Sequence, residues 1–518
     1  MAGSAEEGKA GGVAPAPEGG AGEPLTSDVA GQLGGRAARG ALWAGAAQAV
    51  ALIARLAGLA VLARWLEPAA FGVVAMALVV VGGLGVFRDL GLSAVTVQRA
   101  ERQPAQVSAL FWVNLCAGVG LAGLTWWVAP PVGRFFGEPE LPGLLGALGL
   151  GFVLSGATVQ HQAMLQRKLR LGTLAAVEAC GALGGVAAAI ASALAGAGAW
   201  ALVVQSLVDA GLVGVGCWST SGFRPGRPRR GLGLRADLRF GGQLTGYRVF
   251  NFVARNADDL LIGRVYGSAT LGLYNRAYAL LTLPLRLLHG PLSGAALSAL
   301  SRLQGQPARY RRAYLRLLQK IALVAMPLAA VMAVSTDWLV ALVLGPHFGE
   351  AAELFRLLAP AALVQPVSAA MGWLFVTQGR GREQLRAGAL GSGLALAAIV
   401  VGLPFGPAGV AASYAAVTVT VRAPLLWWLA GRRGPVSTSD ILSCLVLPAT
   451  LTLGVLASSL VLRLALPDLS PGPGLVLVGL AAAGVSGGAL ALLPAGRRAV
   501  QDLAALLTAA FDWKGATR

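Results

Sequence analysis

The sequence has few charged residues, and acidic residues are fewer than basic ones. Charged residues occupy 12% of the 518 positions, whereas a soluble domain carries about 25%. Hydrophobic residues make up 56% of the chain. This composition excludes an ordinary soluble domain and predicts a protein that crosses a membrane many times.

The sequence also lacks the motifs of the common catalytic and cofactor sites. It contains no Walker sequence, no HExxH, no GxSxG and no glycine-rich phosphate loop. Its three histidines lie far apart, and its four cysteines fall within apolar segments without ligand or disulfide spacing. We therefore expect no metal, no cofactor and no enzymatic activity.

Fourteen apolar segments are long enough to span a bilayer, which takes about 20 helical residues. They predict an all-α polytopic membrane protein of two pseudo-symmetric six-helix bundles plus two C-terminal helices. The predicted spans of the first bundle are 41–63, 69–90, 108–129, 141–162, 173–194 and 197–218. Those of the second are 238–262, 268–293, 314–344, 350–377, 386–404 and 407–430, followed by 440–463 and 473–493.

The segments around the spans complete the predicted organisation. Residues 1–35 are polar and rich in Gly, Ala, Pro and Glu, which predicts a disordered cytoplasmic tail. Residues 496–512 have the pattern of a short amphipathic helix. The expected parts are the tail 1–35, a bundle at 36–218, a basic cytoplasmic linker at 219–237, a bundle at 238–433, two helices within 434–495 and a cytoplasmic tail at 496–518.

The basic residues are distributed unequally between the two sides of this topology. Loops after even-numbered spans hold 22 Lys and Arg residues, whereas loops after odd-numbered spans hold four. Basic loops stay on the cytoplasmic side, so both termini and the central linker are expected in the cytoplasm. The four exceptions are Arg64, Arg134, Arg264 and Arg463.

A repeat at a distance of 200 residues relates the two bundles. Internally duplicated transporters consist of two halves of this kind. We therefore predict that the first six spans superpose on the next six, with Arg55 and Arg255 at equivalent depth. The repeated residues are Arg55 and Arg255, Arg64 and Arg264, and Phe71-Gly72 and Leu271-Gly272.

Charged residues inside the spans are the candidates for a functional site, because a charge in the bilayer is costly. Arg55 has no acidic neighbour on its own span, so it requires a partner elsewhere or an anionic ligand. Arg248, Asn251, Arg255 and Asp259 share one face of the seventh span. An Arg255–Asp259 pair that only neutralises itself is the structural alternative.

Buried arginines outnumber buried acids in the predicted spans, which favours an anionic ligand such as a phosphate. In the first bundle the acidic candidates are Glu178 and Asp209, and Arg276 is interpreted as an interfacial anchor. The expected ligand-cavity residues are Arg55, Arg248, Asn251, Arg255 and Arg286, with Asp258 and Asp259 as candidates for ion coupling.

Several motifs resemble those of bacterial polysaccharide-export flippases, the Wzx-like branch of the MOP (multidrug/oligosaccharidyl-lipid/polysaccharide) exporter superfamily. The resemblance covers residues 36–430 and is specific in combination. The motifs are RDLGLSAVTVQR at 88–99, FWxNL at 111–115, RNADDLLIGR at 255–264 and LGLYNRAY at 271–278.

The resemblance implies translocation of an undecaprenyl-diphosphate-linked oligosaccharide, or a related lipid-linked glycan, across the cytoplasmic (inner) membrane. Two bundles would enclose a cationic cavity and alternate access between leaflets, with membrane lipids and other polysaccharide-assembly proteins as partners and no nucleic acid. A peptidoglycan-precursor flippase and a drug/cation antiporter of the same superfamily are the nearer alternatives. A membrane glycan polymerase or ligase is less favoured, because such enzymes carry a long extracytoplasmic loop and none is predicted here.

The charge asymmetry predicts the topology directly. A reporter fused near Gly226 should be cytoplasmic, and a reporter fused near Gly137 should be extracytoplasmic. Paired phosphatase and fluorescent-protein fusions measure both sites, and the reverse result at either one would overturn the topology.

Overall fold

The computed structural model describes only helices, turns and short connections. It covers residues 27–88, 104–168, 170–227 and 235–492, without the side chains of, among others, 27–42, 235–251 and 253–255. The first half comprises α1 (Ser27–Trp65), α2 (Pro68–Gly85), α4 (Pro104–Phe136), α5 (Leu141–Arg167), α6 (Leu171–Leu194) and α7 (Trp200–Ser221).

The second half begins with the longest helix of the described chain, α8 (Arg235–Arg302). Gly267 has φ 78° and divides α8 where the sequence places the gap between its seventh and eighth spans. The helices that follow are α9 (Pro307–Val334), α10 (Thr336–Val343), α11 (Gly349–Thr377), α12 (Gly381–Gly402), α13 (Gly406–Val417), α14 (Ala423–Gly431), α15 (Thr438–Ala465) and α16 (Pro471–Leu492).

The fold class predicted from the sequence is confirmed, and the number of membrane crossings stays a prediction. In the described ranges, 11 stretches are long and apolar enough to cross a membrane. One of them, Gly381–Gly431, contains α12, α13 and α14 together.

Two predicted boundaries differ from the structure. The described part of α1 starts at Ser27, so residues 27–35, which the sequence assigns to the tail, are helical. The linker begins after Ser221 rather than at 219, and the amphipathic segment 496–512 lies outside the described residues.

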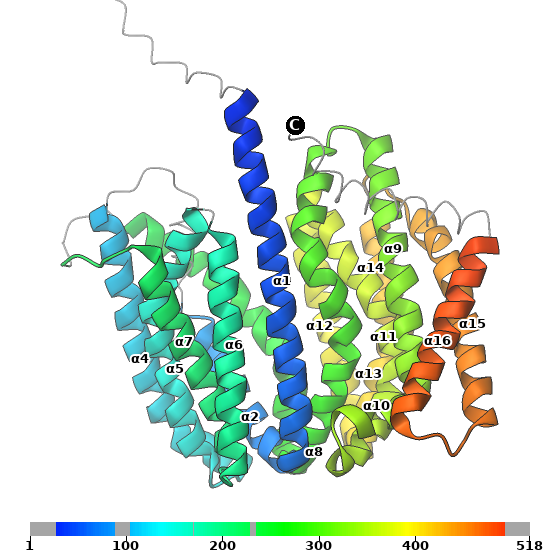
Figure 1. Ribbon diagram of the computed structural model, residues 1–518, viewed down its shortest axis with the longest axis horizontal. Helices are drawn as coiled ribbons and strands as arrows, with labels where there is room; N and C mark the ends of the chain where they lie inside the picture. The colour runs from blue at the N-terminus through cyan, green and yellow to red at the C-terminus, as the bar shows by residue number, and fades with distance from the viewer. Residues whose placement is uncertain (1–26, 89–103, 169, 228–234, 493–518) are drawn as a thin grey trace, which may run out of the picture.

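The two halves are joined at one end and diverge toward the other (Figure 1). A single hydrophobic core runs through both halves near the turns at 65–68, 136–141, 266–268 and 343–349. We call this end the joined end. At the opposite end, the split end, the described core clusters belong to one half each: Leu165, Leu174 and Cys217 in the first, and a larger cluster around Tyr310 and Tyr314 in the second.

Two glycines make the same contact in opposite directions across the joined end. A Cβ added to Gly72 of α2 would lie 1.7 Å from the backbone oxygen of Ser268. A Cβ added to Gly272 of α8 would lie 1.9 Å from the backbone oxygen of Pro68. The two glycines are 200 positions apart in the chain, and so are the two residues that they contact. The crossing therefore follows a pseudo-two-fold axis, as an isologous interface does.

A second symmetric contact lies at the split end. Arg170, which precedes α6, donates a hydrogen bond to the Thr220 carbonyl at the end of α7, at 3.3 Å. Arg380, which precedes α12, donates to the Ala430 carbonyl at the end of α14, at 2.8 Å. Both partners recur 210 residues later, so an arginine satisfies the terminal carbonyls of the sixth helix in each half.

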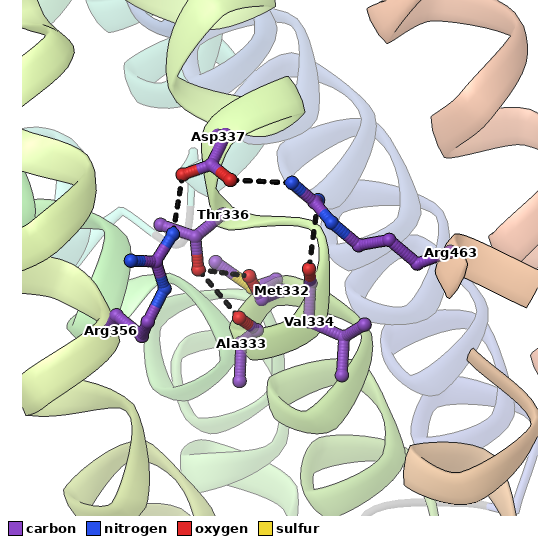
Figure 2. A network of polar contacts seen from close by, with 7 residues as sticks. All are labelled: Met332, Ala333, Val334, Thr336, Asp337, Arg356 and Arg463. Atoms are coloured by element: carbon purple, nitrogen blue, oxygen red, sulfur yellow. Dashed lines mark hydrogen bonds and ion pairs between the residues drawn. The ribbon is translucent and has the colours of Figure 1, made fainter. Parts of the chain in front are cut away.

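The additional helix α15 is tied to the second half at both of its ends. At the split end Asp440 pairs with Arg311 of α9 and forms a capping box with Ser437. At the joined end Arg463 contacts the Asp337 carboxylate at 2.5 Å and donates to the Val334 carbonyl at 3.0 Å (Figure 2). These contacts fix α15 against α9, so we expect α15 to move with the second half.

The glycine crossing predicts an unequal response to alanine. Gly72→Ala and Gly272→Ala should each lower stability by about 1–3 kcal/mol, because the added methyl group overpacks a contact with backbone atoms. Thermal unfolding of the protein in lipid nanodiscs measures the change. Gly120→Ala is the matched control, since no atom lies within 4 Å of its Cβ position; equal stability of all three variants would contradict the tight crossing.

Candidate functional site

Arg55 lies in the face of α1 that packs against α6. Ala51 packs on Ala179 and Ala182, and Gly58 lies against Val186. Between these contacts the Arg55 guanidinium reaches α7, where its Nη2 lies 3.2 Å from Oδ2 of Asp209. In this structure Arg55 therefore has an acidic partner on another helix, Asp209, and its role in a ligand cavity stays a prediction.

The surroundings of this pair are more acidic than the sequence suggested. Asp209 lies against Gly181 and Gly185 of α6, where a Cβ would meet its side chain. Glu178 of α6 is close enough to both Arg55 and Asp209 to interact electrostatically with them. One arginine therefore faces two carboxylates, so this group by itself does not favour an anion.

The polar face predicted on the seventh span is described only in part. Residues 248, 251 and 255 lie in the helical backbone of α8, and the side chains of Arg248, Asn251 and Arg255 lie outside the described residues. The equivalence of Arg55 and Arg255 therefore stays a prediction. Arg286, further along α8, is exposed, and its side chain has no hydrogen bond or ion pair among the described residues.

The two adjacent carboxylates of α8 lie inside the protein. Asp258 is 7% exposed, and Asp259 accepts a hydrogen bond from Nδ2 of Asn275 at 3.3 Å. Two neighbouring charges in an apolar interior are unfavourable, because each loses hydration and repels the other. A proton or a metal cation at this pair would remove that cost.

Arg276 corrects an interpretation made from the sequence. It is not an anchor in the lipid headgroups: its Nη2 donates to Oδ1 of Asn275 at 3.1 Å. Its Cζ lies 4.8 Å from the ring centroid of Phe71, on α2 of the other half. Sequence reasoning missed this role because the two residues are far apart in the chain.

A tyrosine cluster continues this polar region from α8 to α13 within the second half. The Tyr414 hydroxyl of α13 lies 3.3 Å from the Tyr278 hydroxyl of α8. It also accepts from Gln365 Nε2 at 3.2 Å and from Arg422 Nη1 at 3.3 Å. Arg422 ends a five-residue π-helical segment, Thr418–Arg422. Such segments are frequent at functional sites. The sequence signal for this cluster was the presence of polar residues within an apolar span.

Arg356 belongs to a different part of the molecule. Its Nη2 lies 2.6 Å from Oδ1 of Asp337, whose other oxygen meets Arg463 (Figure 2). Thr336 closes the same turn by donating to the Met332 and Ala333 carbonyls. This network holds α10, α11 and α15 together at the joined end.

The architecture is that of a multi-pass membrane transporter built from two duplicated bundles that meet at one end. Solved structures with this fold include the lipid II flippase MurJ in an inward closed conformation, with TM-score 0.67 and 10% identity over 86% of this chain and 97% of that one. An inward-facing multidrug MATE transporter of the MOP superfamily has TM-score 0.57 and 14% identity over 76% and 96% of the two chains.

Sequence comparison identifies the family within this class. The family model described as "Polysaccharide biosynthesis protein" matches residues 61–353, and the chain belongs to this family. The lipopolysaccharide biosynthesis protein WzxC of Escherichia coli K12 is 25% identical over 368 residues, which are 70% of this chain and 74% of that protein. The predicted Wzx-like membership is confirmed, and the protein is a transporter rather than an enzyme.

The Arg55–Asp209 contact can be tested with a double-mutant cycle. Arg55→Gln should destabilise the protein, because it leaves the Asp209 and Glu178 carboxylates without their cation. Asp209→Asn should destabilise it less, because Glu178 remains near Arg55. The double variant should recover part of the loss, with a coupling of about 0.5–3 kcal/mol. Since Arg55 is 56% exposed, solvent screening places the value toward the low end of this range. Strictly additive effects in thermal unfolding would show that the two side chains do not interact.

Proposed function

We propose that this protein is a flippase that moves an undecaprenyl-diphosphate-linked oligosaccharide, or a related lipid-linked glycan, across the cytoplasmic membrane by alternating access. Membership of the polysaccharide biosynthesis family supports this proposal. Similarity to WzxC and the fold shared with a lipid II flippase support it further.

The observation that carries the mechanism is the asymmetry of the core. The halves share one core at the joined end and have separate clusters at the split end. The described basic loops between α5 and α6, α8 and α9, α11 and α12, and α14 and α15 lie at the split end. By the positive-inside rule, they support the proposal that this end faces the cytoplasm. On this proposal, the structure is a state closed toward the outside, and both termini are cytoplasmic.

The diphosphate would be recognised by arginine side chains, whose guanidinium groups match phosphate oxygens in pairs. Arg286 supports this role, because it is exposed and has no partner among the described side chains. Arg248, Asn251 and Arg255 are proposed to complete the site from the same helix. Arg55 would contribute only when Asp209 releases it, since the two are paired here.

The carboxylate pair Asp258 and Asp259 is proposed to couple transport to a cation. Asp258 is buried, and both residues lie on α8, which contacts the first half at Gly272. Binding of a proton or Na⁺ would neutralise charge within the helix that forms the interface. A cation gradient could then drive the change between the two states.

Arginine substitutions test the phosphate proposal. Arg286→Ala should reduce surface glycan at a normal protein level, because one charge-assisted bond contributes about 1.5–3 kcal/mol, roughly a ten- to hundredfold change in affinity. Arg286→Lys should recover only part of the activity, since lysine keeps the charge and loses the bidentate fork.

The matched control is Arg312→Ala at the split end. Arg312 is an exposed arginine of α9 that hydrogen-bonds its own helix at the Ala308 carbonyl, and its loss should leave export near normal. Surface polysaccharide in a strain lacking the chromosomal gene provides the readout. Wild-type export by an Arg55→Ala, Arg255→Ala double variant would contradict the hypothesis that a cationic cavity binds the diphosphate.

A further inference from the structure

A continuous chain of contacts leads from the buried carboxylate pair to the interface between the halves. Asp259 accepts from Asn275 Nδ2 at 3.3 Å, and Asn275 Oδ1 accepts from Arg276 Nη2 at 3.1 Å. Arg276 lies over the ring of Phe71, with 4.8 Å between Cζ and the ring centroid. Asp259, Asn275 and Arg276 all belong to α8, whereas Phe71 belongs to α2 of the opposite half.

Phe71 is part of the seam that closes the joined end. It is 2% exposed, and its ring meets the ring of Phe348 edge-on, with centroids 5.6 Å apart. The neighbouring residue is Gly72, which makes the close crossing with Ser268. A change in the position of Arg276 therefore acts on the tightest contact between the two halves.

We propose that Arg276 is a positioning residue that transmits the charge state of the Asp258–Asp259 pair to the outer seam through Asn275 and Phe71. The inference rests on the proposed cation coupling and assigns its route. With Asp259 charged, Asn275 is held by a charge-assisted hydrogen bond and presents its oxygen to Arg276. The guanidinium is then fixed over Phe71, and the joined end is closed.

Neutralisation of the pair reverses this sequence. A bound proton or Na⁺ weakens the hydrogen bond that orients Asn275, so Arg276 loses its acceptor. The cation–π contact with Phe71 then weakens, and the seam opens more readily. Other titratable or charged groups around the pair and Arg276 are Tyr274, Tyr278 and Arg286 on α8, Tyr414 on α13 and Arg422.

Arg264 provides a matched control at the same seam. Its Cζ lies 5.5 Å from the ring centroid of Phe135, on α4 of the other half. The contact has the same chemistry and also crosses between halves, and no described hydrogen bond links Arg264 to the carboxylate pair. Loss of Arg264 removes a cation–π contact without interrupting the proposed route.

The experiment measures opening of the joined end in the full-length protein. Ala63 is fully buried at this end, close to Gly345 of the other half. Ala63→Cys is introduced into a variant without the four native cysteines and reconstituted in liposomes. The rate of labelling by a membrane-impermeant maleimide is measured with and without Na⁺ at constant pH, and at two pH values without Na⁺. A protein with an exposed cysteine is labelled under the same conditions, and its rate corrects for the change in thiolate reactivity.

In the reporter protein, Na⁺ or a lower pH should increase the corrected rate about twofold to thirtyfold, the range that one cation–π contact contributes. The condition that raises the rate, added Na⁺ or lower pH, identifies the coupling cation. Arg276→Gln should bring the ratio near one, and Phe71→Leu, which keeps an apolar side chain at this position, should do the same. Arg264→Gln should retain the ratio even if its basal rate changes.

The two possible failures are distinguishable. A reporter protein that responds to neither cation would overturn the proposed coupling and this inference together. A normal response that persists in Arg276→Gln and Phe71→Leu would overturn the route through Arg276 and leave the coupling intact. A response lost equally in Arg264→Gln would show that any weakening of the seam removes it, which also overturns the assigned route.

Discussion

The crossing of α2 and α8 is the constraint on which the rest of the molecule depends. At Gly72 and Gly272 the backbones approach so closely that a Cβ atom would overlap a carbonyl oxygen of the opposite helix. The contact is made twice under one pseudo-two-fold axis, so both halves contribute equally to it. It brings the core residues of both halves into one cluster at the joined end, and the ends farther from it remain separate.

Polar residues inside the spans serve this architecture in two ways. Some fix helices to one another: Asp337 links Arg356 of α11 to Arg463 of α15 at the joined end. Others lie where the halves meet, as Arg276 does over Phe71. The first kind keeps each half rigid, and the second kind allows the state of one half to influence its contact with the other. A transporter that alternates between two states requires both properties.

Much of the fold could be predicted from the sequence, and less of the candidate site. Apolar length located the helices, and the repeat of Phe71-Gly72 as Leu271-Gly272 indicated the duplication that the glycine crossing displays. The excess of buried arginine over acid was a weaker guide. It left open whether Arg55 pairs with another span or binds an anionic ligand, and the fold places Asp209 beside it from 154 residues away. Charge counting along a chain records how many charges are present and cannot record which of them cancel.

The sequence by itself determined the class of protein and its two-fold repetition, because these follow from local composition and from comparison along the chain. The basic-residue count predicts the sidedness. The tertiary structure decided which end of the molecule is closed and which side chains meet across the closure. Arg276 is next to Asn275 in sequence, yet its guanidinium lies over the ring of Phe71, 205 residues earlier. Helix packing alone brings these residues together, because contact between distant helices depends on crossing geometry and shape.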